Sequence, residues 1–199
     1  MDFRVLLEKA YGPKAHPKVL TPKPTRSRPR LVLANRENAC GRMITNHKQV
    51  GFEVIVFNPK RTTPLHESYA SLNSNHAMIV VHGASLTHSL FFRPGSVFIQ
   101  VVPIGINWAA FADIGRGARS LNLEYSEYKI GVNESSLVDK SGKENFLLKD
   151  PSALLKKGWP SEFMKIYLKE QNVKLDLERF KSCLKEAYTK AKRFVDKNG

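Results

Sequence analysis

The chain has 199 residues, of which 42% are hydrophobic and 25% are charged, a balance typical of a globular protein. This composition excludes a mainly disordered chain and a collagen-like chain. Its 32 Lys and Arg residues against 18 Asp and Glu residues give a formal net charge of +14. Such a charge suits an acidic partner, such as a phosphate-bearing ligand, a nucleic acid or another polyanion.

Other features of the sequence argue against several classes of protein. The two cysteines, Cys40 and Cys183, are too few for a disulfide framework or a four-cysteine zinc site. No stretch approaches the roughly 18 apolar residues that a membrane-spanning helix needs. The start, MDFRVLLEKA, carries Asp2 and Glu8 and lacks a long apolar core, so it does not predict a signal peptide.

The first 30 residues predict a basic leader followed by an extended linker, because residues 12–30 contain five prolines. Short apolar runs then predict strands at 31–34 (LVLA), 51–57 (GFEVIVF), 77–81 (AMIVV) and 97–102 (VFIQVV). Residues 64–75 predict a helix with Leu65, Tyr69 and Leu72 on one face, and HGASLTHSLFF after residue 81 predicts a turn that opens another helix. This alternation indicates an α/β fold with a parallel sheet.

The C-terminal third is predicted to be helical. From Leu177 onward, apolar residues recur with a 3.6-residue period, and Lys and Glu occupy the opposite face. The apolar stripe comprises Phe180, Leu184, Ala187, Tyr188, Ala191, Phe194 and Val195. Asp176 is the predicted N-cap, so we expect a long helix that packs on one side only.

The segment Val80–His88 carries the most informative chemistry. A buried strand ends there and a turn with Gly83 opens a helix, and ligands of open α/β sheets bind outside the carboxyl ends of strands. Free N–H groups at a helix start and a glycine that lets the backbone approach closely both suit a pyrophosphate. His82, Ser85 and Thr87 add side-chain donors. On this motif alone, a purely structural histidine stays open as the alternative.

A second polar patch, residues 35–46, follows the strand at 31–34. The carboxyl ends of parallel strands open on the same edge of a sheet, so we expect Arg36 to face the His82 turn, where arginine can contact phosphate with two donors. An exposed loop arginine is the alternative. The sequence holds no phosphate-binding P-loop, no nucleophile elbow and no metal motif.

Many separate motifs occur in the order seen in plant members of glycosyltransferase family 61. They are RLVLANR at 30–36, GFEV at 51–54, VVHGASLT at 80–87, FRPG at 92–95, IQVVP at 99–103, Trp108, YSEY at 125–128, ESSL at 134–137, Asp150-Pro151, Gly158-Trp159 and QNV at 171–173. FRVLLEKAYG at 3–12 is similar as well. The chain therefore resembles this family over nearly its whole length, most closely its xylan arabinosyl- and xylosyltransferases.

The resemblance implies a two-domain GT-B enzyme that is inverting, needs no metal or other cofactor and uses a UDP-sugar as donor. The expected reaction transfers a pentose, arabinose or xylose, to xylan or a related glycan of the plant cell wall. This chain resembles the C-terminal half, with a Rossmann-like donor-binding domain expected at 31–199, and the resemblance implies that the family's N-terminal acceptor domain and membrane anchor are not part of this sequence. Full-length members are Golgi membrane proteins, so we expect that location, a membrane link only through the absent anchor, and no nucleic-acid partner.

The resemblance also implies roles for individual residues. His82 and Arg36 are the expected catalytic residues. The expected diphosphate-binding set is Arg36, Arg42, His82, Gly83, Ala84, Ser85 and Thr87. Trp108 and Glu134 are candidates for sugar or nucleoside contacts, although a buried tryptophan and a helix-capping glutamate explain them as well. Tyr125 and Tyr128 are expected to belong to the core.

The chain departs from the family pattern at three places. Ser85 stands where Gly or Ala is common, Asn107 stands where Asp is frequent, and Met43–Val50 replaces a longer helical segment. The short segment and the absent half favour a catalytically silent paralogue that at most binds nucleotide. The net charge favours a basic polyanion-binding protein, whose nucleic-acid binding would depend steeply on salt. Both alternatives stay open, and the sequence assigns no general base for the acceptor hydroxyl.

Overall fold

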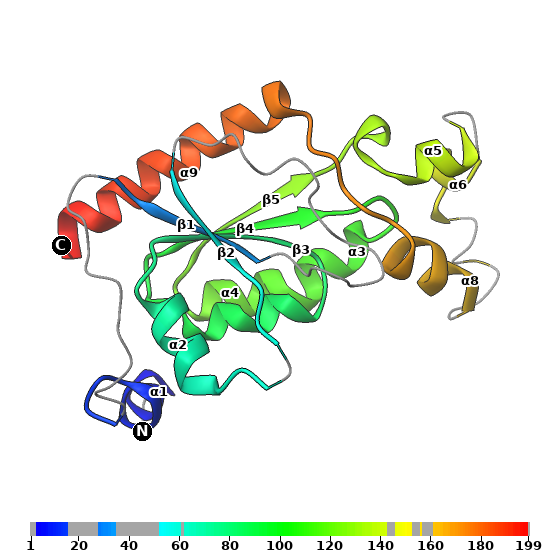
Figure 1. The fold of residues 1–199 in the computed structure, drawn as a ribbon. Coiled ribbons are helices and arrows are strands. Elements are labelled where there is room, and N and C mark those ends of the chain that lie inside the picture. Colours follow the sequence, from blue (N-terminus) through cyan, green and yellow to red (C-terminus); the bar gives the residue numbers. More distant parts are fainter. Residues whose placement is uncertain are drawn as a thin grey trace.

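Figure 1 shows a computed structural model of the chain, which describes residues 3–15, 28–34, 52–60, 62–142, 146–152, 156 and 161–198. At its centre lies a five-stranded, all-parallel sheet with the strand order β2-β1-β3-β4-β5. The strands are β1 (Arg30–Ala34), β2 (Glu53–Phe57), β3 (Ala77–Val81), β4 (Val97–Val102) and β5 (Glu124–Lys129). The predicted α/β fold with a Rossmann-like parallel sheet is confirmed, and all four predicted strands are present.

Helices cover both faces of the sheet (Figure 1). The long helix α9 (Leu177–Asn198) packs on one face, and α2 (Leu65–Asn73), the 3₁₀-helix η1 (Ala84–Phe91) and α4 (Arg116–Ser120) pack on the other. Every residue of β1, β3 and β4 is buried as a result. Parallel strands covered on both faces are mostly apolar, which explains why these strands were predictable from short apolar runs.

The C-terminal helix α9 forms as predicted. Oδ1 of Asp176 accepts hydrogen bonds from the N–H groups of Glu178 and Arg179, each at 3.1 Å, so Asp176 caps the first turn. The buried positions of the helix are Phe180, Leu184, Ala187, Ala191 and Phe194. These residues belong to the predicted stripe, because a 3.6-residue period places them on the face that meets the sheet.

Helix α2 lies within the predicted range, and the three residues predicted to share one face differ in burial. Tyr69 and Leu72 are buried, whereas Leu65 is 57% exposed. Leu65 is the first residue of the helix and belongs to neither core cluster of the sheet. Periodicity places it on the same side as Tyr69, but no packed layer of the described chain extends far enough to cover it.

Helix α1 (Phe3–Tyr11) and strand β5 are two of the elements that were not predicted from sequence patterns. Helix α1 lies in the basic leader and packs against α2, where the hydroxyl of Tyr69 donates to Oε2 of Glu8 at 2.7 Å. The edge strand β5 has the polar sequence EYSEYK and pairs with β4 from Val97 to Val102. A strand at the edge of a sheet has neighbours on one side only, so it tolerates polar residues that hide its periodicity.

A third cluster lies beyond the carboxyl ends of the strands, toward which the arrowheads of β4 and β5 point in Figure 1. Its buried residues are Ile106, Ala109, Leu137, Leu148, Phe163 and Tyr167. They come from or adjoin α3 (Asn107–Ala109), α5 (Leu137–Ser141), α6 (Phe146–Lys149), α8 (Ser161–Phe163) and η4 (Met164–Lys169). The chain between α3 and α4 (Ala110–Gly115) is also helical, and η3 (Val132–Glu134) precedes α5.

Replacing Gly105 with alanine is expected to lower the free energy of unfolding by about 2–3 kcal/mol. Gly105 has a φ angle of +84°, and an added Cβ would lie 2.9 Å from the fully buried ring of Tyr167. Urea unfolding measures the effect. Gly117→Ala is the control, because Gly117 lies in α4 with no described atom within 4 Å of an added Cβ. There alanine should stabilise by up to about 1 kcal/mol, and equal effects at both positions would contradict the packing argument.

Candidate functional site

The turn after β3 occupies the position at which the sequence predicted a binding loop. His82 and Gly83 join the last residue of β3 to Ala84, the first residue of η1. Gly83 has φ 150° and ψ −170°, a conformation that is essentially restricted to glycine. The following helix is a 3₁₀-helix of eight residues. The first N–H groups of a helix have no acceptor within that helix, so those of this turn suit an anion.

His82 is mostly buried, with 9% of its surface exposed, and is attached to the sheet at two points. Its backbone N–H donates to the carbonyl oxygen of Val101 at 2.9 Å. Its Nδ1 lies 2.7 Å from Nε2 of Gln100, a residue of β4. Oε1 of Gln100 in turn accepts a hydrogen bond from the hydroxyl of Tyr125 on β5 at 2.6 Å. The imidazole is thereby linked across two neighbouring strands.

Tyr125 marks the outer end of this chain of contacts. It lines a cavity of about 380 Å³ together with Arg119, Ser126, Glu127 and Lys129. Its hydroxyl oxygen also lies 2.9 Å from Oε1 of Glu127, whose other carboxylate oxygen is 3.6 Å from Nζ of Lys129. Burial, followed by the contact with Glu127, raises the pKa of Tyr125, so its hydroxyl keeps the proton that it donates.

The other predicted residues of this turn have mixed surroundings. Ala84 is exposed and Ser85 is half-buried. The exposed Thr87 donates its hydroxyl hydrogen to the carbonyl oxygen of Ala84 at 2.8 Å, a bond within the helix. Oxygen lone pairs of Thr87 remain able to accept, but its donor role toward a phosphate requires that this bond opens. Roles for Ser85 and Thr87 in ligand binding stay predictions.

Arg36, Arg42 and the short segment Met43–Val50 lie outside the described residues. The strand that precedes them is described, and it supports the argument from which their position was predicted. β1 pairs with β3 in parallel, with Ala34 opposite Val80. The chain that leaves β1 therefore starts at the same sheet edge as the His82 turn.

Trp108 follows the neighbouring strand β4 and is the second residue of α3. It is 53% exposed, so the alternative of a buried structural tryptophan is wrong. Since β3 and β4 are adjacent and parallel, Trp108 and the His82 turn both follow carboxyl ends at the same edge. An exposed indole ring at this edge remains a candidate for a sugar contact.

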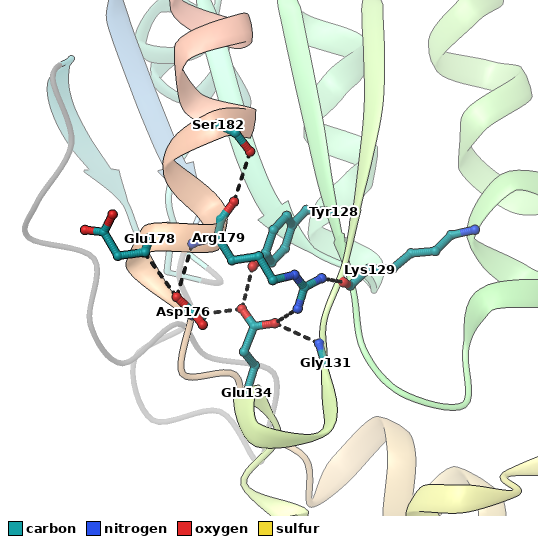
Figure 2. A network of polar contacts seen from close by, with 8 residues as sticks. All are labelled: Tyr128, Lys129, Gly131, Glu134, Asp176, Glu178, Arg179 and Ser182. Carbon is teal, nitrogen blue, oxygen red and sulfur yellow. Dashed lines mark hydrogen bonds and ion pairs between the residues drawn. The ribbon is translucent and has the colours of Figure 1, made fainter.

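Glu134 has a different environment, which Figure 2 shows. Its side chain is almost fully buried and accepts four hydrogen bonds from within the protein. Oε1 accepts from the hydroxyl of Tyr128 at 2.6 Å and from the N–H of Asp176 at 2.8 Å. Oε2 accepts from the N–H of Gly131 at 2.7 Å and from the guanidinium of Arg179.

The surroundings of Glu134 favour the capping role that the sequence left open. The bond from Gly131 closes the turn of η3, and the bonds from Asp176 and Arg179 tie that turn to the start of α9. The guanidinium of Arg179 also lies 4.8 Å from the ring centre of Tyr128, over its face. Tyr128 is buried, as expected for a core residue. A nucleoside contact by Glu134 stays a prediction.

The sequence did not predict that Gln100 contacts His82, or that Tyr125 contacts Gln100. One signal was present, because Gln100 is the single polar residue of the run VFIQVV. A polar side chain inside a buried strand needs a hydrogen-bond partner. Its partners were not predictable from the run itself, since they lie on other elements of the fold.

The described ranges contain no helix that is both long and apolar enough to cross a membrane. A scan against models of known protein families gives no match.

Comparison with curated proteins finds clear relatives. The chain is 42% identical over 211 residues to a xylan glycosyltransferase of Arabidopsis thaliana, covering 96% of this chain and 42% of that protein. An alpha-1,3-arabinosyltransferase of Oryza sativa subsp. japonica is 33% identical over 193 residues, covering 94% of this chain and 33% of that protein. A beta-1,2-xylosyltransferase of the same rice is 31% identical over 194 residues, covering 94% of this chain and 41% of that protein. The chain thus spans less than half the length of these relatives. It is a homologue of plant xylan glycosyltransferases, which confirms its resemblance to glycosyltransferase family 61.

Proposed function

We propose that this chain is the nucleotide-sugar-binding part of a plant xylan glycosyltransferase that uses a UDP-sugar to transfer a pentose, arabinose or xylose. The observation that carries the proposal is the turn of His82 and Gly83 at the carboxyl end of β3. Its backbone requires glycine, it opens a helix, and it holds a largely buried imidazole. The names of the relatives support arabinose or xylose as the transferred sugar and xylan as the acceptor, whereas the UDP-sugar donor follows from the family resemblance.

In the proposed reaction, a hydroxyl oxygen of the glycan attacks the anomeric carbon of the donor sugar. The bond from that carbon to the diphosphate oxygen breaks, and UDP leaves with the bonding electrons. Attack from the face opposite to the leaving group inverts the anomeric configuration. The acceptor proton passes to a general base, which we do not assign.

The diphosphate gains negative charge as the bond breaks, and fixed donors lower the energy of that state. We assign this role to His82, to the backbone N–H groups of Gly83 and Ala84, and to Arg36 with Arg42. No metal is part of the proposal, in which the guanidinium groups of Arg36 and Arg42 would supply positive charge together with the start of η1. The GT-B domain arrangement and the Golgi location stay predictions from the family resemblance.

Millimolar UDP is expected to raise the melting temperature of the native chain by about 5–10 °C. A ligand at about 100 times its Kd adds about 2.7 kcal/mol to the stability of the folded state, and each kcal/mol shifts a domain of this size by about 2–4 °C. His82→Ala and Arg36→Ala should abolish most of the shift, because each removes a diphosphate contact. Differential scanning fluorimetry with and without UDP measures it.

Two matched variants control this experiment. His66→Ala removes a histidine from α2, and Arg193→Ala removes an exposed cation from α9, and both should keep the shift. If Arg193→Ala reduces the shift as much as Arg36→Ala, binding depends on net charge and the polyanion alternative is favoured. A cooperative melt without any shift in the native chain contradicts the proposed site. A UDP shift without sugar transfer to xylan oligosaccharides would favour the silent paralogue.

A further inference from the structure

We propose that Gln100 and Tyr125 are positioning residues that fix His82 in the tautomer whose Nε2 carries the proton, so that this N–H is the group that His82 presents to the diphosphate. The proposal rests on the proposed function of the His82 turn and adds the residues that set its hydrogen-bonding polarity. It is carried by the contacts that run from β5 through β4 to the end of β3.

Gln100 is the central member of these contacts and an unusual residue for its place. It is fully buried in β4, on the same face of the strand as Phe98, which clusters with Met78 and Val80. Burying an amide in apolar surroundings is costly unless its polar atoms are hydrogen-bonded. Both ends of this amide have partners, His82 on one side and Tyr125 on the other. A residue needed only for packing at this position would be apolar.

The amide determines where the imidazole proton lies. A side-chain amide nitrogen carries hydrogens and no available lone pair, so Nε2 of Gln100 donates to Nδ1 of His82. In a neutral imidazole, a nitrogen that accepts leaves the proton on the other nitrogen, here Nε2. The hydroxyl of Tyr125 donates to Oε1 of Gln100 and thereby decides which end of the amide faces His82.

Glu127 competes for the single hydroxyl proton of Tyr125, and two observations favour Gln100. The contact with Gln100 is shorter, at 2.6 Å against 2.9 Å. The carboxylate of Glu127 is part of the cavity wall and has the ammonium of Lys129 as a second partner, whereas Oε1 of Gln100 is inside the sheet. If Tyr125 donated to Glu127 instead, the amide would turn over and the imidazole proton would move to Nδ1. The two arrangements therefore predict opposite tautomers.

The tautomer matters because a phosphate oxygen accepts hydrogen bonds and does not donate them. With the proton on Nε2, His82 can donate to the diphosphate that the proposed function also assigns to the first N–H groups of η1. With the proton on Nδ1, the imidazole would present a lone pair to an anion, which is repulsive. Gln100 thus determines whether His82 presents an N–H or a lone pair to the diphosphate, without itself contacting the ligand.

The test combines a spectroscopic signature with UDP binding. Long-range ¹H–¹⁵N correlation spectra of the native chain, with the signals of His82 identified by their loss in His82→Ala, should show a protonated Nε2 and an unprotonated Nδ1. Gln100→Glu replaces the donor with a carboxylate that only accepts, so the proton should move to Nδ1 and UDP binding should weaken by about tenfold or more. The spectra require no ligand, so they report on the tautomer even if UDP does not bind.

Two tyrosine variants distinguish an effect on the orientation of His82 from an effect on the stability of the fold. Tyr125→Phe and Tyr128→Phe each remove a hydroxyl that makes a 2.6 Å bond from β5, but only the first bond leads to His82. Tyr125→Phe should weaken UDP binding several-fold and mix the tautomers, whereas Tyr128→Phe should lower the melting temperature and keep both properties. A protonated Nδ1 in the native chain, or equal effects of the two variants on UDP affinity, overturns the proposal. The expected tautomer without any UDP binding would overturn the proposed function and leave the tautomer assignment standing.

Discussion

Glu134→Ala is expected to lower the free energy of unfolding by about 3–5 kcal/mol, which corresponds to roughly 10 °C in melting temperature. The substitution removes the acceptor of four hydrogen bonds at once. It leaves the guanidinium of Arg179 without its carboxylate and the hydroxyl of Tyr128 and two backbone N–H groups without acceptors. Unpaired buried donors cost their full desolvation energy, so the loss exceeds that of an ordinary surface ion pair.

Urea unfolding of Glu134→Ala beside Glu186→Ala measures this effect. Glu186 pairs with Lys190 one turn along α9, 2.7 Å away, but its side chain is largely exposed, so its removal should cost no more than about 0.5 kcal/mol. Glu134→Gln should fall between the two, because an amide accepts at one atom only. Similar losses in Glu134→Ala and Glu186→Ala would show that the buried network in Figure 2 contributes little.

Three of the four predicted strands, β1, β3 and β4, are buried on both faces and consist mostly of apolar residues that a short window of sequence detects. The fourth, β2, is a partly exposed edge strand whose sequence EVIVF is nevertheless mostly apolar. β5, the other edge strand, differs because four of its six residues are polar. β5 is extended because it forms backbone hydrogen bonds with β4. The local sequence EYSEYK does not predict that pairing. A tertiary contact thus determines the structure of the last strand.

The same distinction between local and distant interactions applies to the candidate site. His82, Gly83 and Ala84 are contiguous, so the change from buried strand to turn was visible in the sequence and identified the loop. Gln100 acts on His82 from 18 residues away, and Tyr125 acts through Gln100 from the next strand. Those contacts require the strand order β3-β4-β5, which the sequence did not supply. Local motifs located the candidate binding turn, and only the folded sheet shows which residues contact His82 and Gln100.

Glu134 illustrates a further limit of prediction from the sequence. Its sequence motif, ESSL, was compatible with a ligand contact or with a helix cap. The choice depended on whether the carboxylate would meet donors of the protein, and these come from Gly131 nearby and from Asp176 and Arg179 some forty residues later. A buried acid and its distant partner cannot be paired from spacing alone. The structure pairs them, and the network then explains how α9 is fixed to the end of β5.

His76 is expected to make the stability of the fold pH-dependent. Its side chain is buried before β3, and its Nδ1 accepts a hydrogen bond from the backbone N–H of Arg30 at 3.0 Å. Burial, together with the charges of Arg93 and Arg30, lowers the pKa of His76 to about 4 from 6.5. Between these two values, the unfolded chain binds a proton that the folded chain excludes. The contribution is therefore complete above pH 6.5 and is lost as the pH falls toward 4, amounting to about 3 kcal/mol.

Comparing the native chain with His76→Gln isolates this contribution, because the carboxylates of both proteins titrate alike and cancel in the difference. Glutamine retains an acceptor for the N–H of Arg30 but has no proton to gain in this range. Urea unfolding at pH 7 and pH 4 should show that the native chain loses about 3 kcal/mol more than the variant. An NMR titration of His76 gives the same answer directly, since its ring signals should not change between pH 7 and pH 5. Parallel losses in the two proteins, or a midpoint near pH 6.5 for His76, would contradict the assignment of a buried, neutral imidazole.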